Sequence, residues 1–196
     1  MIVFLNGASC SGKTSLVRAL QARWPGLLLH WSLDHAISQM PIHYTGANAP
    51  TQEGFPLCEI SATQGAYTRV DVGPLGKRLS AIGAGYVKNL ADAGFDVVVD
   101  YVLVDSSLWR PFEPLRVQGD FVFAGIFCDE ELLERRNEQR SDRAQKLAVA
   151  QQRSIHGPSI RSNYDIELDS SDRTADELSV DLIDYIRTRQ GSPNNH

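Results

Sequence analysis

The chain has 196 residues, of which 42% are hydrophobic and 22% charged, and its formal net charge is -5. This balance is ordinary for a folded domain, and it disfavours nucleic-acid binding because phosphate backbones are bound by clustered lysine and arginine. No run approaches the roughly 18 apolar residues of a membrane span, and the start lacks the basic region of a signal peptide, so we expect a cytoplasmic protein that binds neither membranes nor nucleic acids.

The first forty residues alternate between strand-like and helix-like apolar patterns. Residues 2–5 and 27–31 are largely apolar runs that predict buried strands. Between them, residues 12–23 carry apolar side chains at helical spacing and predict a helix. A second, short helix is expected to begin at Asp34.

The middle of the chain begins with an irregular stretch over residues 42–73. It contains "GANAPTQEGFP", which is rich in turn-forming residues. A long irregular stretch inside a compact domain is typical of a functional or mobile segment. Gly73-Pro74 then opens a helix that we expect to continue to about residue 93. The predicted buried face of this helix comprises Leu75, Leu79, Ile82, Tyr86 and Leu90.

The second half of the chain continues the alternation of strands and helices. Residues 95–99 predict a third strand with Asp100 at its end. The remaining predicted elements are a fourth strand over 120–127, a charged helix over 130–153, a fifth strand over 166–168 and a closing helix over 174–189. This order predicts an α/β fold of three layers with a five-stranded parallel sheet. We expect a single domain over residues 1–190 and a disordered tail over 191–196.

The turn after the first strand matches the phosphate-loop pattern G-x-x-x-x-G-K-[ST]. Its residues are Gly7, Ala8, Ser9, Cys10, Ser11, Gly12, Lys13 and Thr14. Backbone N–H groups at a helix N-terminus attract an anion, glycines let the loop close around phosphates, and the threonine hydroxyl is placed for Mg²⁺. A plain glycine-rich turn is the alternative. A lysine at a helix N-terminus opposes the helix dipole, however, so ATP bound with Mg²⁺ explains the sequence better.

Two carboxylates follow strands whose carboxyl ends face the same crevice as this loop. Asp34 follows the second strand, where it can accept the proton of an attacking hydroxyl or cap the short helix. Asp100 ends the sequence "DVVVD", the form of a Walker B acid. We therefore expect Asp34 to be catalytic and to contact the substrate, and Thr14 and Asp100 to bind Mg²⁺.

The stretch "ERRNEQRSDR" places Arg136, Arg140 and Arg143 on one face of the predicted charged helix. A solvated face paired with the neighbouring acidic residues is one interpretation. In small kinases, an arginine-rich segment after the fourth strand closes over ATP as a lid and stabilises charge on the transferred phosphoryl group. We expect such a lid, with Lys13, Arg136 and Arg140 catalytic and Arg143 binding the nucleotide.

Together these segments resemble the chloramphenicol phosphotransferase family, whose members are P-loop kinases with a nucleotide-kinase-like fold. The resemblance runs through "FLNGASCSGKT", through the pattern D-x-x-I-x-x-M-P that starts at Asp34, and through "AGFDVVVDYV". It continues with "CDEELLERRNEQRSDR", with Gln151 and His156, and with "YDIELDSS". It therefore covers most of the chain.

The resemblance implies that the γ-phosphoryl group of ATP is transferred to a primary hydroxyl of chloramphenicol, which inactivates the antibiotic by 3-O-phosphorylation. It implies that Asp34 activates this hydroxyl, that Lys13 and Thr14 serve phosphate and Mg²⁺, and that the three arginines lie in the lid. Tyr101 stands where the family often has a second acid. Residues 42–72, which should line the acceptor pocket, show no similarity to it.

Several residues and the function itself keep alternative interpretations. Met40, Tyr101 and Trp109 either line an aromatic acceptor pocket, in which Met40 and Tyr101 contact the substrate, or pack in the core. His156 is either a site residue or structural. The alternatives for function are a kinase of another metabolite or a nucleotide, and a nucleotide-dependent switch without an acceptor. The assembly state stays open, a homo-oligomer included.

Overall fold

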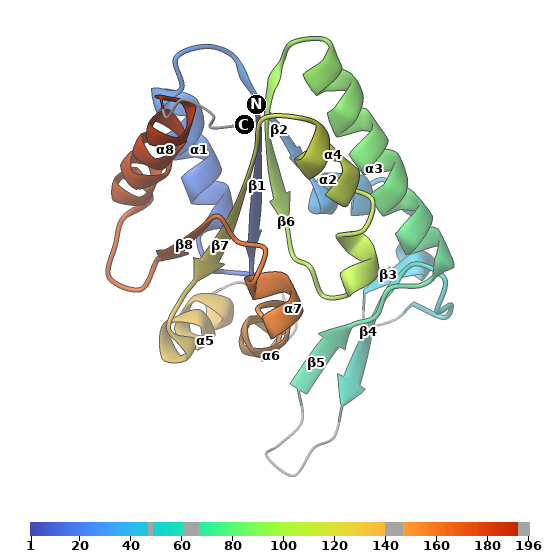
Figure 1. The fold of residues 1–196 in the computed structure, drawn as a ribbon. Coiled ribbons are helices and arrows are strands. Elements are labelled where there is room, and N and C mark those ends of the chain that lie inside the picture. The colour runs from blue at the N-terminus through green and yellow to red at the C-terminus, as the bar shows by residue number, and fades with distance from the viewer. Residues whose placement is uncertain (47–48, 61–66, 140–146, 192–196) are drawn as a thin grey trace.

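The computed structural model describes residues 1–46, 49–60, 67–139 and 147–191 (Figure 1). Its centre is a five-stranded, all-parallel sheet with the strand order β2-β6-β1-β7-β8. The strands are β1 (Ile2–Gly7), β2 (Leu28–Ser32), β6 (Asp96–Tyr101), β7 (Phe121–Phe127) and β8 (Ile166–Asp169). The predicted α/β fold with a five-stranded parallel sheet is thus confirmed.

Helices cover both faces of this sheet and complete three layers (Figure 1). One face carries α1 (Lys13–Arg23) and α8 (Ala175–Gly191), and the other carries α2 (Leu33–Ile37), α3 (Pro74–Asp92) and α4 (Glu113–Gln118). Side chains of β1 alternate between the faces: Val3 and Leu5 are buried with α1 and α8, whereas Phe4 packs among aromatic rings on the other face. Across the described ranges, no helix combines the length and apolar character needed to cross a membrane.

A second, small sheet lies in the stretch that the sequence predicted to be irregular. It is formed by β3 (Thr45–Gly46), β4 (Phe55–Ile60) and β5 (Tyr67–Val70), and a 3₁₀ turn precedes it at Ile42–Tyr44. β4 and β5 are antiparallel, and β5 packs against α6 (Leu147–Ile155). The prediction was wrong here because these strands are short and mostly half-exposed, so apolar alternation is weak.

Helix α3 has the predicted bounds to within a residue, but its buried face is only partly the predicted one. Ile82 and Tyr86 were expected inside, and they are 67% and 52% exposed. The residues that face the sheet are small or medium in size: Gly76, Ser80, Gly83, Ala84 and Val87. A Cβ atom at Gly83 would lie only 2.3 Å from the Trp31 ring, so close packing selects the small residues. Ile82 and Tyr86 are consequently turned outward, whereas Leu79 and Leu90 of the predicted face are partly buried against the core.

The charged stretch that predicted one helix over 130–153 contains two. α5 (Glu130–Glu138) ends with Gln139 as its C-cap, and α6 begins at Leu147. Leu133 of α5 and Ala148 of α6 are buried in the same small cluster as Ala8. One straight helix cannot bring both residues to Ala8, so the single-helix prediction was wrong. A further short helix, α7 (Pro158–Arg161), was missed.

A largely buried hydrogen-bond network connects the end of β1 to the end of α6 and to Tyr164, which follows α7. Nδ2 of Asn6 donates to the Ile155 carbonyl at 3.2 Å and to the Tyr164 hydroxyl at 2.6 Å. Because this hydroxyl accepts from Asn6, its own hydrogen is directed to Nδ1 of His156, 2.7 Å away. The His156 ring also stacks on Phe127, with 4.0 Å between ring centroids. This placement favours the structural interpretation of His156.

We expect this network to make the protein less stable below neutral pH. Burial lowers the pKa of His156 from 6.5 to about 4. The unfolded chain therefore takes up a proton at higher pH than the folded protein does. The contribution of His156 to the free energy of unfolding is complete above pH 6.5, and it is lost as the pH falls from 6.5 to about 4. A shift of one pKa unit corresponds to about 1.36 kcal/mol of unfolding free energy. Because the His156 ring is partly exposed, we expect a smaller loss than the full shift would give, ~1–2 kcal/mol.

Urea unfolding near pH 7 and near pH 4 measures this loss. His156→Gln cannot take up a proton but keeps an oxygen that accepts from Tyr164, so it should show a smaller loss of unfolding free energy over the same interval. An equal loss in the variant and the wild type would assign the pH dependence to other groups.

Candidate active site

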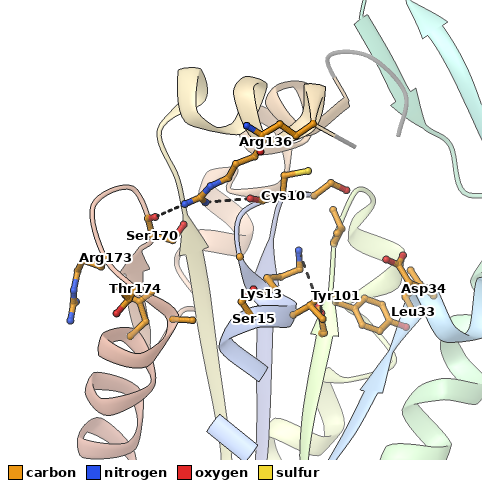
Figure 2. Close-up of a pocket in the computed structure, with 18 residues that line it drawn as sticks. Cys10, Lys13, Ser15, Leu33, Asp34, Tyr101, Arg136, Ser170, Arg173 and Thr174 are labelled. Carbon is orange, nitrogen blue, oxygen red and sulfur yellow. Dashed lines mark hydrogen bonds and ion pairs between the residues drawn. The ribbon is translucent and has the colours of Figure 1, made fainter. Parts of the chain in front are cut away.

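The loop between β1 and α1 lies at the carboxyl end of the central sheet (Figure 2). Gly12 precedes α1 with φ at 91°, a left-handed conformation that favours glycine. Gly7 is required for a different reason, because a Cβ there would lie 2.7 Å from Oγ of Ser11 and 2.9 Å from the Ile126 carbonyl oxygen. Cys10 is also left-handed, with φ at 64°, the kind of backbone strain that functional loops hold.

Lys13, the first residue of α1, places a buried cation at the centre of this loop. Its exposed fraction is 7%. Nζ donates to the carbonyl oxygens of Gly7 at 2.7 Å and Ala8 at 2.8 Å, and it lies 3.8 Å from Oδ1 of Asp100. A cation beside the N–H groups that begin a helix forms an anion-binding site.

Thr14 and Asp100 form a hydrogen-bonded pair beside Lys13. Asp100 lies near the end of β6, where it is paired in register with Leu5 of β1, so its carboxylate reaches the start of α1. Oγ1 of Thr14 donates to Oδ2 of Asp100 at 3.0 Å. Hydroxyl and carboxylate oxygens are hard ligands of the kind that Mg²⁺ prefers. The pair therefore fits the metal that the sequence predicts here.

A cavity of about 770 Å³ lies over these residues. Its size is within the range of roughly 300–1,000 Å³ that is typical of small-molecule sites. Lys13 lies near the middle of the lining residues, Asp34 lies on one side, and Arg173 and Thr174 lie on the opposite side (Figure 2). A ligand that spans the cavity therefore passes the phosphate loop between these two sides.

Asp34 lies in the first turn of α2 and has an exposed side chain at the edge of the cavity (Figure 2). The N-cap of α2 is Ser32, whose Oγ accepts from the His35 N–H at 3.2 Å. Ser32 thus fills the capping role that the sequence had left open for Asp34. A carboxylate at the edge of a cavity is a group that can act as a proton acceptor.

Arg136 reaches from α5 over the phosphate loop. Its Nη1 donates to the Cys10 carbonyl and its Nη2 to the Ser170 carbonyl, each at 3.4 Å (Figure 2). Arg136 also lines the cavity and adds a second positive charge to it. The other two arginines of the predicted lid, Arg140 and Arg143, lie outside the described residues.

Sequence reasoning missed the contribution of the segment between β8 and α8. Ser170, Arg173 and Thr174 line the cavity, and Oγ of Ser170 donates to the Ser11 carbonyl at 2.8 Å. The available signal was the polar run "DSSDRT" directly after the fifth strand, because the carboxyl ends of parallel strands share one edge. The role of Gln151 was also missed: its Oε1 accepts from the Ser9 N–H at 2.8 Å.

The residues predicted to line an aromatic acceptor pocket are largely in the core. Tyr101 borders the cavity but is 1% exposed, stacks on Trp31, and shares a hydrogen bond of 3.1 Å with Ser80. Burial raises the pKa of Tyr101. Trp109 is 3% exposed and packs in the same cluster, and Met40 packs against that cluster from outside.

The solved structures that this chain resembles include P-loop kinases. Shikimate kinase from Acinetobacter baumannii, in complex with shikimate, has a TM-score of 0.60 and 15% identity, covering 97% of this chain and 95% of that chain. The APS kinase of Mycobacterium tuberculosis, in complex with AMPPNP and APS, has a TM-score of 0.59 and 17% identity, covering 95% and 96%. The tunicamycin resistance protein of Deinococcus radiodurans has a TM-score of 0.60 and 10% identity, covering 97% and 95%. At these identities the likeness shows the fold.

Among curated proteins, none matches this chain. The family model described as "Chloramphenicol phosphotransferase-like protein" matches residues 1–187, nearly the whole chain. This match confirms the resemblance recognised in the sequence and supports a nucleotide-dependent kinase with a small-molecule substrate. The chain therefore belongs to the chloramphenicol phosphotransferase-like family.

Proposed function

We propose that the protein transfers the γ-phosphoryl group of ATP to a hydroxyl of a small molecule, with the 3-hydroxyl of chloramphenicol as the leading acceptor. The observation that carries this proposal is the arrangement around one cavity. Buried Lys13 and the Thr14–Asp100 pair lie between Asp34 on one side and the start of α8 on the other. Phosphoryl transfer needs such a set because its catalysis consists mainly of positioning and of stabilising charge.

The nucleotide belongs over the phosphate loop. The N–H groups at the start of α1 and Nζ of Lys13 would hold the β and γ phosphates. Thr14 and Asp100 would hold Mg²⁺, which supplies charge neutralisation on the phosphate oxygens when bound. Arg136 reaches over the same loop and would stabilise charge on the group in transfer. The nucleoside would then lie toward Arg173, because the acceptor takes the side of Asp34.

Asp34 would serve as the general base. During transfer, the acceptor oxygen forms a bond to the γ-phosphorus, and the bond from that phosphorus to the ADP oxygen breaks. The proton of the acceptor hydroxyl moves to a carboxylate oxygen of Asp34. The exposed position of Asp34 at the cavity edge supports this role, because an acceptor can reach it from solvent.

The small sheet β3–β5 would select the acceptor. β5 packs against α6, and α6 contacts the phosphate loop through Gln151. Val70 of β5 and Val72, like Met40, are partly buried against the aromatic core cluster, which places this segment on the α2 side of the sheet. Apolar side chains near one proton-accepting carboxylate, that of Asp34, would suit an acceptor that carries an aromatic ring and a hydroxyl.

Incubation with ATP, Mg²⁺ and chloramphenicol is expected to give the drug with one added phosphoryl group, detected by mass spectrometry. A chloramphenicol analogue without the 3-hydroxyl is the matched control and should give no product. ADP formation without a phosphorylated drug would reject chloramphenicol, and a panel of metabolites and nucleotides would then be tested as acceptors. ADP formation that no acceptor increases would instead favour a nucleotide-dependent switch.

A further inference from the structure

His30 of β2 holds a buried nitrogen beside the proposed metal site. Side chains alternate along a strand, so His30 faces the same side of the sheet as Leu28, which is buried against α1 and α8. Among the described residues, Nε2 of His30 is buried and has no hydrogen-bond partner. Oδ2 of Asp100 lies 3.9 Å from this nitrogen. Most buried polar atoms have a partner, so the position of this nitrogen beside a carboxylate calls for an explanation.

The carboxylate that His30 faces is already engaged by the phosphate loop. The Thr14 hydroxyl donates to the same oxygen, Oδ2, and Nζ of Lys13 lies 3.8 Å from Oδ1. The two carboxylate oxygens together can accept about four hydrogen bonds, so Oδ2 has a free position for a second donor. A hydrogen bond from Nε2 would need the gap to shorten by about 1 Å.

We propose that His30 is a positioning residue that orients the Asp100 carboxylate for Mg²⁺. The inference rests on the proposed function. An Nε2–H of His30 donates to Oδ2 and fixes the rotation of the carboxylate, while Thr14 and the other oxygen face the metal. Residues in this outer position tune metal affinity because they hold the ligand in the geometry that the metal needs. The donation requires only a hydrogen on Nε2, so the inference does not depend on the charge of the imidazole.

A purely structural role makes different predictions. The His30 ring lies edge-on to the His35 ring, with centroids 5.3 Å apart, so it also contributes packing. If packing is its whole role, a leucine of similar bulk should preserve nucleotide binding, or should weaken it equally with and without metal. If orientation of Asp100 is its role, only the binding that depends on Mg²⁺ should change.

The test measures the dissociation constant of ATP by calorimetry, once with Mg²⁺ and once with EDTA, in wild type, His30→Leu and His30→Gln. The ratio of the two constants reports the contribution of the metal. We expect His30→Leu to reduce this ratio about tenfold while leaving the constant in EDTA unchanged. His30→Gln carries an amide N–H close to the position of Nε2 and should restore most of the ratio. Thermal unfolding establishes that each variant is folded.

A double-mutant cycle shows whether His30 acts through Asp100. In an Asp100→Asn background, adding His30→Leu should reduce the ratio no further. A wild-type ratio in His30→Leu, an equal loss with and without Mg²⁺, or a further loss in the Asp100→Asn background would each overturn the inference. If Mg²⁺ does not strengthen ATP binding even in the wild type, the metal role in the proposed function fails and the inference fails with it.

Discussion

Replacing Asp34 by asparagine should reduce the rate of phosphoryl transfer by about 10²–10⁴-fold, because the amide cannot take the hydroxyl proton. ATP binding should change by no more than about twofold, since phosphate and metal contacts are assigned to other residues. The fold should also be unaffected, because Asp34 is exposed and Ser32 provides the cap of α2. Single-turnover kinetics, calorimetry with ATP and thermal unfolding measure the three quantities.

The matched control is Asp184→Asn, which changes an exposed aspartate on α8 outside the lining of the cavity. It should transfer phosphate at the wild-type rate. Wild-type turnover in Asp34→Asn would exclude Asp34 as the base. Equal losses of ATP binding and turnover would instead indicate that Asp34 supports the nucleotide site.

Replacing Lys13 by methionine should lower both ATP affinity and the rate of transfer, with kcat/KM reduced by roughly 10²–10³-fold. Methionine keeps the apolar stem, so the measured loss comes mainly from the ammonium group. The variant also leaves the Gly7 and Ala8 carbonyls without the donor that contacts them now, so a small loss of stability is expected. Steady-state kinetics with ATP as the varied substrate, together with urea unfolding, separates the two effects.

Lys88→Met provides the control for this variant. Lys88 lies on the exposed side of α3 and pairs with Asp92, so its loss removes a charge that is outside the lining of the cavity. Its kinetic constants should equal those of the wild type. Unchanged ATP affinity in Lys13→Met would reject the assignment of this loop as the phosphate site.

Local patterns predicted the elements whose position is set by their own sequence. The phosphate-loop signature over residues 7–14 predicts the end of a strand, a tight turn and the start of a helix, and the structure has each of them. The three central strands, β1, β6 and β7, were found because each is a largely buried apolar run, as the middle of a parallel sheet requires. The edge strands β2 and β8 are less buried, and they were found from shorter apolar stretches. These are features that a short window of sequence determines.

The features that were missed depend on contacts between distant segments. The rotation of α3 is set by Trp31, which needs a glycine opposite it, and periodicity alone cannot reveal that partner. Gln151 reaches Ser9 across 142 positions in the sequence. The strands of the small sheet are stabilised by pairing with one another and by α6, so their own residues carry a weak signal.

The hydrogen bonds of Lys13 to its own loop bear on how the protein discriminates among ligands. Nζ of Lys13 already donates to the Gly7 and Ala8 carbonyls. The binding free energy that a phosphate obtains from Lys13 is therefore only the difference between its own hydrogen bonds to Nζ and those that it replaces. A neutral ligand or a weak acceptor cannot compete with two well-placed carbonyl dipoles, whereas a polyanion forms stronger, charge-assisted bonds. We therefore expect this loop to favour ligands with a high negative charge over neutral ligands and weak acceptors.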